Sequence, residues 1–174
     1  MAKQGSIGRR LESCFNSYIH NDFEGALVHL FPAIDKTGKL RRSKDGVGAR
    51  IKSFLADEED IISVTATNIL MVNNVINGFT FPEAMYKFGR TSIMHEGELD
   101  PRLIIGEGLD LSLGHVWQLP ATYVLAMAIS VITAPENKNE FFIDNKIIHI
   151  NDKNYRVNDL WGKSAKLRKD LNIP

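Results

Sequence analysis

One segment of the sequence combines two residue types that can act together on a phosphodiester. Arg90 and His95 lie five residues apart within residues 86–97. An imidazole titrates near neutral pH and can move a proton, and a guanidinium carries a permanent planar charge that suits phosphate. Cleavage of a phosphodiester without a metal needs a proton carrier and a cation that stabilises negative charge on phosphate oxygens. The pair therefore fits metal-independent chemistry on a phosphodiester, with Arg90 and His95 as the catalytic candidates.

A helix from about Phe81 to His95 is predicted to carry this pair. Thr80 and Glu83 have the spacing of a capping box, and Gly97 stands where a left-handed C-terminal cap is expected. Residues five apart on an ideal helix are about 140° apart around its axis. Contact with one substrate therefore requires either an unwound helix end or a symmetric second copy of the chain.

Residues 86–97 resemble the signature of the HEPN family, the higher eukaryote and prokaryote nucleotide-binding domains. In that signature an arginine is followed by four to six residues and then by a histidine near the end of a helix, and Arg90 and His95 match it. Thr91 stands where the family commonly has a polar residue such as asparagine, so it keeps the polarity without the amide. The resemblance covers about residues 6–134 and looks like the small prokaryotic type.

The resemblance implies a mainly α, HEPN-like helical bundle, with small β-hairpin additions after the Arg-x4-His helix and near the C-terminus. It also implies an endoribonuclease that acts as a homodimer, in which His95 handles the proton and Arg90 stabilises the charged transition state. A defence or toxin setting, with an antitoxin or regulatory partner, fits such an enzyme. One alternative is a non-catalytic HEPN-like domain that binds RNA or a nucleotide, or only dimerises. A second is an interaction scaffold whose helix 121–134 packs against a partner.

A basic, loop-like stretch at residues 36–52 is the other candidate for contact with RNA. Such charge runs commonly form a solvated surface, and their functional interpretation is a patch for phosphates. The 21 Lys and Arg residues balance 21 Asp and Glu residues, so RNA contact has to come from local patches of this kind. The residues predicted to make it are Lys39, Arg41, Arg42 and Lys44.

The sequence lacks the parts that several common sites need. It has no phosphate-binding loop of the P-loop type, and its Gly106-Glu107-Gly108 lacks the third glycine of a dinucleotide fingerprint. No two histidines have zinc-ligand spacing, and Cys14 is the single cysteine. We therefore expect no cofactor, no metal site and no intrachain disulfide.

Periodicity and turn residues predict one domain of 174 residues, with a core at about 6–134 and a β-rich extension at about 139–174. Helices are expected at about 6–20, 23–36, 47–55, 61–76, 81–95, 121–134 and 158–171, a β-hairpin at 103–113, and short strands at 141–143, 147–150 and 155–157. The most apolar stretch, 123–134, is about half the length needed to cross a bilayer and is expected to be a buried helix. The first ten residues contain no apolar run, so a cytoplasmic protein without membrane contact is expected.

Overall fold

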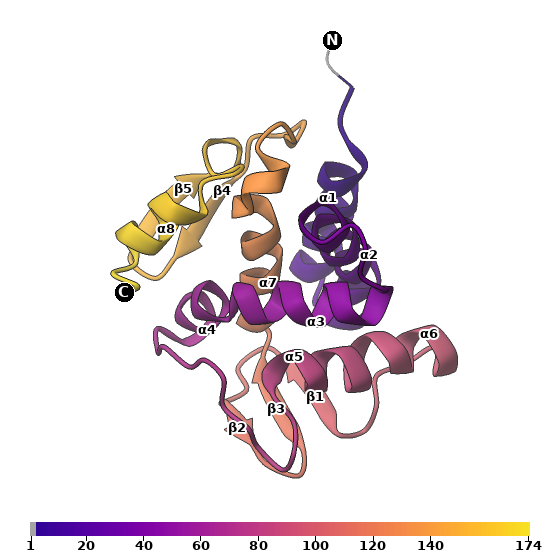
Figure 1. Ribbon diagram of the computed structural model, residues 1–174. Coiled ribbons are helices and arrows are strands. Elements are labelled where there is room, and N and C mark those ends of the chain that lie inside the picture. The colour runs from indigo at the N-terminus through magenta and orange to yellow at the C-terminus, as the bar shows by residue number, and fades with distance from the viewer. Residues whose placement is uncertain (1–2) are drawn as a thin grey trace.

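Helices form most of the fold in the computed structural model, which describes residues 3–174 (Figure 1). The expectation of a mainly α protein is therefore confirmed. The first two helices, α1 (Ser6–Ile19) and α2 (Phe23–Arg41), pack against each other as a hairpin. The Asp22 carboxylate begins α2 by accepting a hydrogen bond from the Gly25 N–H at 2.8 Å, as an N-cap residue does.

Helix α2 is longer than the sequence pattern predicts. The pattern ends the helix near Lys36, but the helix continues to Arg41. Pro32 lies inside it at an exposed position, where the loss of one backbone donor does not end the helix. Lys39 and Arg41 therefore lie on the last turns of a helix and not in a loop.

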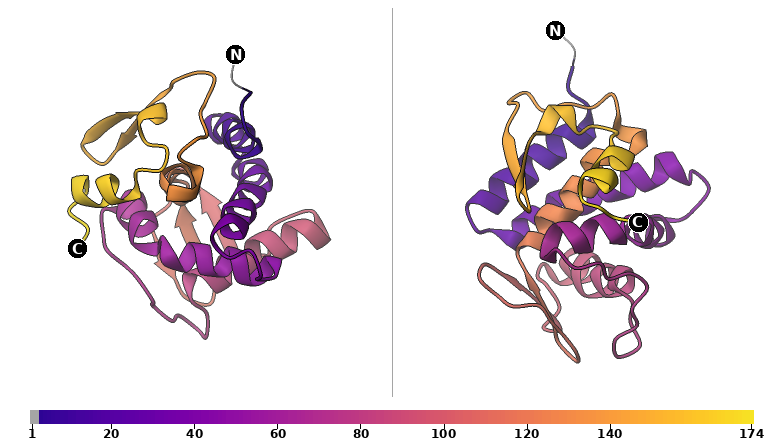
Figure 2. Two further views of the ribbon diagram at one scale, coloured as in Figure 1. Left: turned by 45° about the horizontal axis from the view of Figure 1, so that its top comes forward. Right: turned by 90° about the vertical axis from the view of Figure 1, so that its left-hand side faces the viewer.

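The other helices are arranged around α7, which the left-hand view of Figure 2 shows nearly end-on. Their bounds are α3 (Val47–Asp57), α4 (Glu59–Thr67), α5 (Phe81–Ala84), α6 (Ser92–Glu96), α7 (Thr122–Thr133) and α8 (Ser164–Asp170). A π-helical stretch, η1 (Met85–Thr91), joins α5 to α6, so the three form one continuous helix beside α3.

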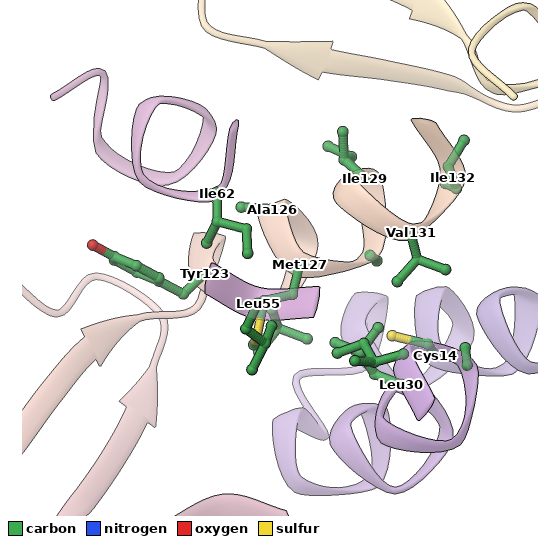
Figure 3. Close-up of a cluster of buried hydrophobic side chains, with 14 of the residues drawn as sticks. Cys14, Leu30, Leu55, Ile62, Tyr123, Ala126, Met127, Ile129, Val131 and Ile132 are labelled. Carbon is green, nitrogen blue, oxygen red and sulfur yellow. The ribbon is translucent and has the colours of Figure 1, made fainter. Parts of the chain in front are cut away.

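The predicted buried helix is confirmed as α7, which lies in the hydrophobic core. Its side chains meet Cys14, Leu30 and Leu55 from α1, α2 and α3 (Figure 3). A helix that is apolar on all sides has to be covered by other elements, and here the chain itself covers it. The idea that helix 121–134 presents a face to a partner is thereby corrected. Within residues 3–174, no helix has the length and apolar character to cross a membrane.

The expected helix at 61–76 is only half formed, because α4 ends at Thr67. The left-handed Asn68, with φ of 60°, closes it, and residues 69–80 are largely irregular. Two side chains of α4 bind the irregular segment: the Ser63 hydroxyl and the Glu59 carboxylate each accept a backbone N–H at 3.1 Å. The many β-branched residues of this stretch lower its helix propensity, so these bonds replace further helical turns.

The expected β-hairpin at 103–113 is wrong in its pairing. Strand β3 lies between the other two strands, parallel to β1 and antiparallel to β2. The strands are β1 (Leu103–Gly106), β2 (Ser112–Leu113) and β3 (Trp117–Pro120). Trp117 and Leu119 on β3 are almost fully buried, so the core needs this strand in the central position. The turn at Gly108 exists, with φ of 68°, but it reverses the chain without pairing β1 to β2.

The C-terminal segment contains the predicted hairpin, with β4 (Ile147–Ile150) antiparallel to β5 (Lys153–Arg156). The strand expected at 141–143 is absent from the structure, because the Asn158 side chain binds both the N–H and the C=O of Phe142 in place of a neighbouring strand. The Phe142 ring makes edge contacts with Phe15 and Trp161 at 5.6 and 5.5 Å between centroids. The segment therefore shares one hydrophobic core with the helices.

Candidate functional site

The helix that carries Arg90 is held at both ends by local capping. Thr80 Oγ1 accepts the Glu83 N–H at 3.4 Å, and the Glu83 carboxylate accepts the Thr80 N–H at 2.8 Å. At the other end Gly97 adopts the left-handed conformation, with φ of 81°. The predicted helix at 81–95 and both of its caps are confirmed. Its middle is π-helical, a form that occurs frequently at functional sites.

Arg90 lies on the last turn of η1 and is partly buried. Its guanidinium carbon is 5.8 Å from the centre of the Tyr86 ring, within cation–π range. Arg90 also lines an apolar groove of about 150 Å³ between α2, α3 and α6. The carboxylate in this groove, Asp35, pairs with Arg50 at 2.8 Å, and no described residue forms an ion pair with Arg90.

His95 is exposed on α6, near the C-terminal end of the helix. The groove beside Arg90 is lined by Ile93 and Met94, but His95 is not part of its wall. Within one chain, the structure therefore places the two predicted residues on one helix without bringing them into a single pocket.

Exposed apolar side chains surround the groove beside Arg90. Val28 of α2 is 45% exposed, Val47 of α3 is 37% exposed and Met94 of α6 is 64% exposed, and all three line the groove. Solvent contact with apolar side chains is unfavourable, and neighbouring exposed ones commonly mark an interaction surface.

The predicted basic patch is divided by the fold. Lys39 and Lys44 are exposed, as a phosphate-binding role requires. Arg41 instead forms ion pairs of 2.8 to 2.9 Å with Asp57, Glu58 and Glu136. The neighbouring Arg42 pairs with the same Asp57 at 2.7 Å. Both arginines are therefore paired with carboxylates of the chain, Arg41 with three and Arg42 with one, whereas Lys39 and Lys44 are exposed.

Sequence reasoning missed an aromatic and basic groove on the same helix as Arg90. Tyr86 lines it together with Lys52 and Lys87, and its volume is about 380 Å³. Lys52 Nζ lies 5.8 Å from the centre of the Tyr86 ring. The only signal in the sequence was that Tyr86 and Arg90 are four residues apart, which places them on neighbouring turns.

A comparison with protein families assigns the chain as a whole. The family model described as Rv1289 matches residues 6–173. The chain belongs to the Rv1289 family. It is similar to the uncharacterized protein Rv1289 of Mycobacterium tuberculosis and to the uncharacterized protein Mb1320 of Mycobacterium bovis. Each is 23% identical over 186 residues, which cover 97% of this chain and 89% of the relative. No solved structure matches.

Two further observations on this member of the Rv1289 family concern metal-ligating side chains and the single thiol. Among residues 3–174, no group of three or more His, Cys, Asp or Glu side chains is placed to hold a metal ion. The thiol of Cys14 is buried in the core, and this burial raises its pKa to about 12. A thiol with so high a pKa is not a nucleophile at neutral pH.

A buried acid that the sequence did not indicate lies in an apolar pocket between α4, β3 and α7. Glu59 is 5% exposed, and its carboxylate accepts the Asn73 N–H. Burial raises the pKa of Glu59, and burial together with the Glu59 charge raises the pKa of Tyr123 to about 12. Because the Glu59 carboxylate anchors the irregular segment after α4, we assign it a structural role.

Proposed function

We propose that this chain is a metal-independent endoribonuclease of the HEPN type, which acts as a homodimer with Arg90 and His95 as its catalytic residues. One observation carries the proposal. Arg90 has no ion-pair partner among the described residues, and it lies beside a groove on the same helix as an exposed imidazole. An uncompensated, partly buried arginine is poised for an anionic ligand, whereas Arg41 already has three carboxylate partners.

The proposed reaction is a transesterification within RNA. The 2′-oxygen forms a bond to the adjacent phosphorus while the bond to the 5′-oxygen of the next nucleotide breaks. One proton leaves the 2′-hydroxyl and one is taken up by the 5′-oxygen, and the imidazole of His95 is the group that exchanges them. The guanidinium of Arg90 stabilises the negative charge that develops on the phosphate oxygens. The products are a cyclic 2′,3′-phosphate and a 5′-hydroxyl.

The homodimer is supported by the surface around Arg90. Val28, Val47 and Met94 expose apolar area there, and contact with a second copy would remove it from water. In a two-fold interface the same patch serves both partners, so α6 of one protomer approaches α6 of the other. In such an arrangement Arg90 and His95 can face the same substrate although they point in different directions on one helix, because the cleft is built from two helices.

The test is cleavage of a mixed pool of labelled single-stranded and structured RNAs in EDTA. The parent protein is compared with the Arg90→Ala, His95→Ala double variant and with His115→Ala, which changes an exposed histidine outside α6. We expect cleavage by the parent and by His115→Ala and none by the double variant. Cleavage by all three proteins would overturn the catalytic assignment. RNA binding without cleavage by the parent would support the non-catalytic alternative instead.

A further inference from the structure

The groove that contains Tyr86 lies directly beside the proposed catalytic site. Its volume of about 380 Å³ lies in the range of about 300–1,000 Å³ that small-ligand sites occupy. Thr91 lines this groove, and its neighbour Arg90 lines the apolar groove between α2 and α6. Neighbouring residues at the end of η1 therefore line the two grooves.

Tyr86 is partly exposed, and two cations lie near its aromatic ring. Lys52 Nζ and Arg90 Cζ each lie 5.8 Å from the centre of the ring. The ring also passes close to α3: a Cβ atom on Gly48 would lie 2.9 Å from the Tyr86 hydroxyl oxygen and 3.0 Å from the ring carbon that bears it. A glycine in the first turn of α3 lowers helix propensity, but here it makes room for the tyrosine ring.

The charges of the groove favour an anionic ligand. Lys87 Nζ lies 5.0 Å from the centre of the Phe79 ring, which also lines the groove, so a second cation and aromatic pair lies next to Tyr86. The acid in the groove, Glu83, is bound to the start of the helix, where its carboxylate accepts hydrogen bonds from the N–H and the hydroxyl of Thr80. Lys52 and Lys87 therefore remain as the positively charged side chains that can contact a ligand in the groove.

A cationic groove with an aromatic platform is the arrangement by which proteins bind single-stranded nucleic acid. Successive bases stack on aromatic rings, and lysine or arginine side chains contact the phosphates. Stacking requires an unpaired base, but it tolerates any sequence because every base has a planar face. The lysines that now lie near the rings are flexible enough to turn towards phosphates when a base takes their place.

We propose that this groove is a nucleotide subsite, which rests on the proposed function and specifies its substrate as single-stranded RNA. The base of a nucleotide next to the scissile phosphate stacks on Tyr86. Lys52 and Lys87 contact the flanking phosphates, while Arg90 holds the phosphate that reacts. The subsite fixes the register of the strand on the helix and selects unpaired over paired RNA.

The test measures binding of a labelled single-stranded RNA by fluorescence anisotropy, in a His95→Ala background that prevents cleavage. Tyr86→Leu removes the aromatic platform, and Tyr86→Phe keeps it. Tyr155→Leu is the matched control, since Tyr155 is also partly buried and has Lys166 Nζ at 5.5 Å from its ring, but it lies on β5. We expect Tyr86→Leu to weaken binding roughly 5- to 150-fold, from the known stacking energies, and the other two variants to bind like the parent.

A second measurement separates base stacking from other effects of the substitution. An RNA with one abasic nucleotide, moved through each position in turn, should bind the parent more weakly at one position than at the others. With Tyr86→Leu that positional loss should disappear, because the ring that reads the base is gone. Lys52→Gln and Lys87→Gln should each lower the dependence of log affinity on log salt by about one, whereas Lys166→Gln should not.

The outcomes separate this inference from the proposed function. If Tyr86→Leu binds and cleaves like the parent, the subsite is wrong while the ribonuclease proposal stands. If binding depends on Tyr86 but the parent cleaves no RNA, the subsite stands and the catalytic proposal fails. If the parent binds no single-stranded RNA, both are overturned. Equally weakened binding by Tyr86→Leu and Tyr86→Phe would overturn the subsite, because the phenylalanine keeps the ring.

Discussion

Arg41 and Arg90 both lie near the end of a helix segment, yet the fold uses them in opposite ways. Arg41 lies among three carboxylates, and Arg168 of α8 pairs with two acids of the same cluster, Glu58 at 3.1 Å and Asp60 at 2.7 Å. Arg90 instead lies over an aromatic ring beside an apolar groove. The number of basic residues in a stretch therefore says little about binding, because acids far away in the sequence pair with some of them.

The cluster around Glu58 is an anchor between helices. Glu58 is almost fully buried, with 4% of its side chain exposed, and it accepts hydrogen bonds from Arg41 of α2 and Arg168 of α8. Burial raises the pKa of Glu58, and the two guanidinium groups oppose that rise. Cations from the second helix and the last helix therefore meet at one carboxylate, which fixes α8 against the bundle.

The largest expected effect is that of His95→Ala on the rate of RNA cleavage. Under the proposed function, His95→Ala lowers the rate of RNA cleavage roughly 100- to 10,000-fold, the usual contribution of a proton-transfer residue. The melting temperature should stay unchanged, because His95 is exposed. Single-turnover cleavage and thermal unfolding measure the two quantities, with His115→Ala as the control. A cleavage rate equal to the parent's would remove His95 from the mechanism.

For the Glu58 cluster we expect a loss of stability with no change in the rate of RNA cleavage. Glu58→Gln replaces one of two carboxylate oxygens that accept hydrogen bonds from Arg41 and Arg168 by an amide N–H₂ donor, so one buried hydrogen bond is lost and the free energy of unfolding should fall by about 1–3 kcal/mol. Urea unfolding measures this change, and Glu98→Gln, at an exposed acid, should change it by less than about 0.5 kcal/mol. The Glu58→Gln protein that is folded should cleave RNA at the same rate as the parent. A stability equal to the parent's would mean that the cluster is not an anchor.

Acidification should weaken the same cluster in a defined direction. Burial raises the pKa of Asp57, but hydrogen bonds from Arg42 and Arg41 outweigh this effect and hold the pKa below its ordinary value of 3.8. A lowered folded pKa contributes stability above the unfolded pKa, and this is lost as the pH falls through the folded value. Asp57→Asn should therefore destabilise the protein at pH 6 and lose its effect towards pH 2.

Urea unfolding at several pH values measures that difference against the parent. Glu58 has the opposite sign, since its raised pKa favours proton uptake by the folded state. For this reason the difference in stability between Asp57→Asn and the parent is more informative than the pH profile of the parent alone. A destabilisation by Asp57→Asn that is equal at both pH values would contradict the ion-pair explanation.

The smallest expected effect concerns the start of the helix that carries Arg90. Thr80→Ala removes the side-chain acceptor of the capping box and should lower the free energy of unfolding by about 0.5–2 kcal/mol. Thr80→Ser keeps the hydroxyl and should cost less than Thr80→Ala. Urea unfolding compares the three proteins. Equal losses for serine and alanine would show that the methyl group, and not the cap, holds this end of the helix.

Several elements could be predicted because their signals are local. The capping box at Thr80, the left-handed cap at Gly97 and the apolar run of α7 depend on residues within a few positions of one another. The pairing of β1 with β3 could not be predicted, since it depends on which strand the core buries, and Gly106–Gly108 looked like a hairpin turn. The end of α4 depended on bonds from its side chains to the segment that follows.

Local signals in the sequence are enough to predict the helix of Arg90 and His95 and its two caps. The tertiary structure decides which cations pair with acids, since Arg41 meets Glu136, and Arg168 meets Glu58, across about a hundred residues of chain. It also decides that Lys52 comes to lie over Tyr86. Local hydrogen bonds follow from neighbours in the sequence, whereas ion pairs and grooves form where burial of apolar side chains brings distant elements together.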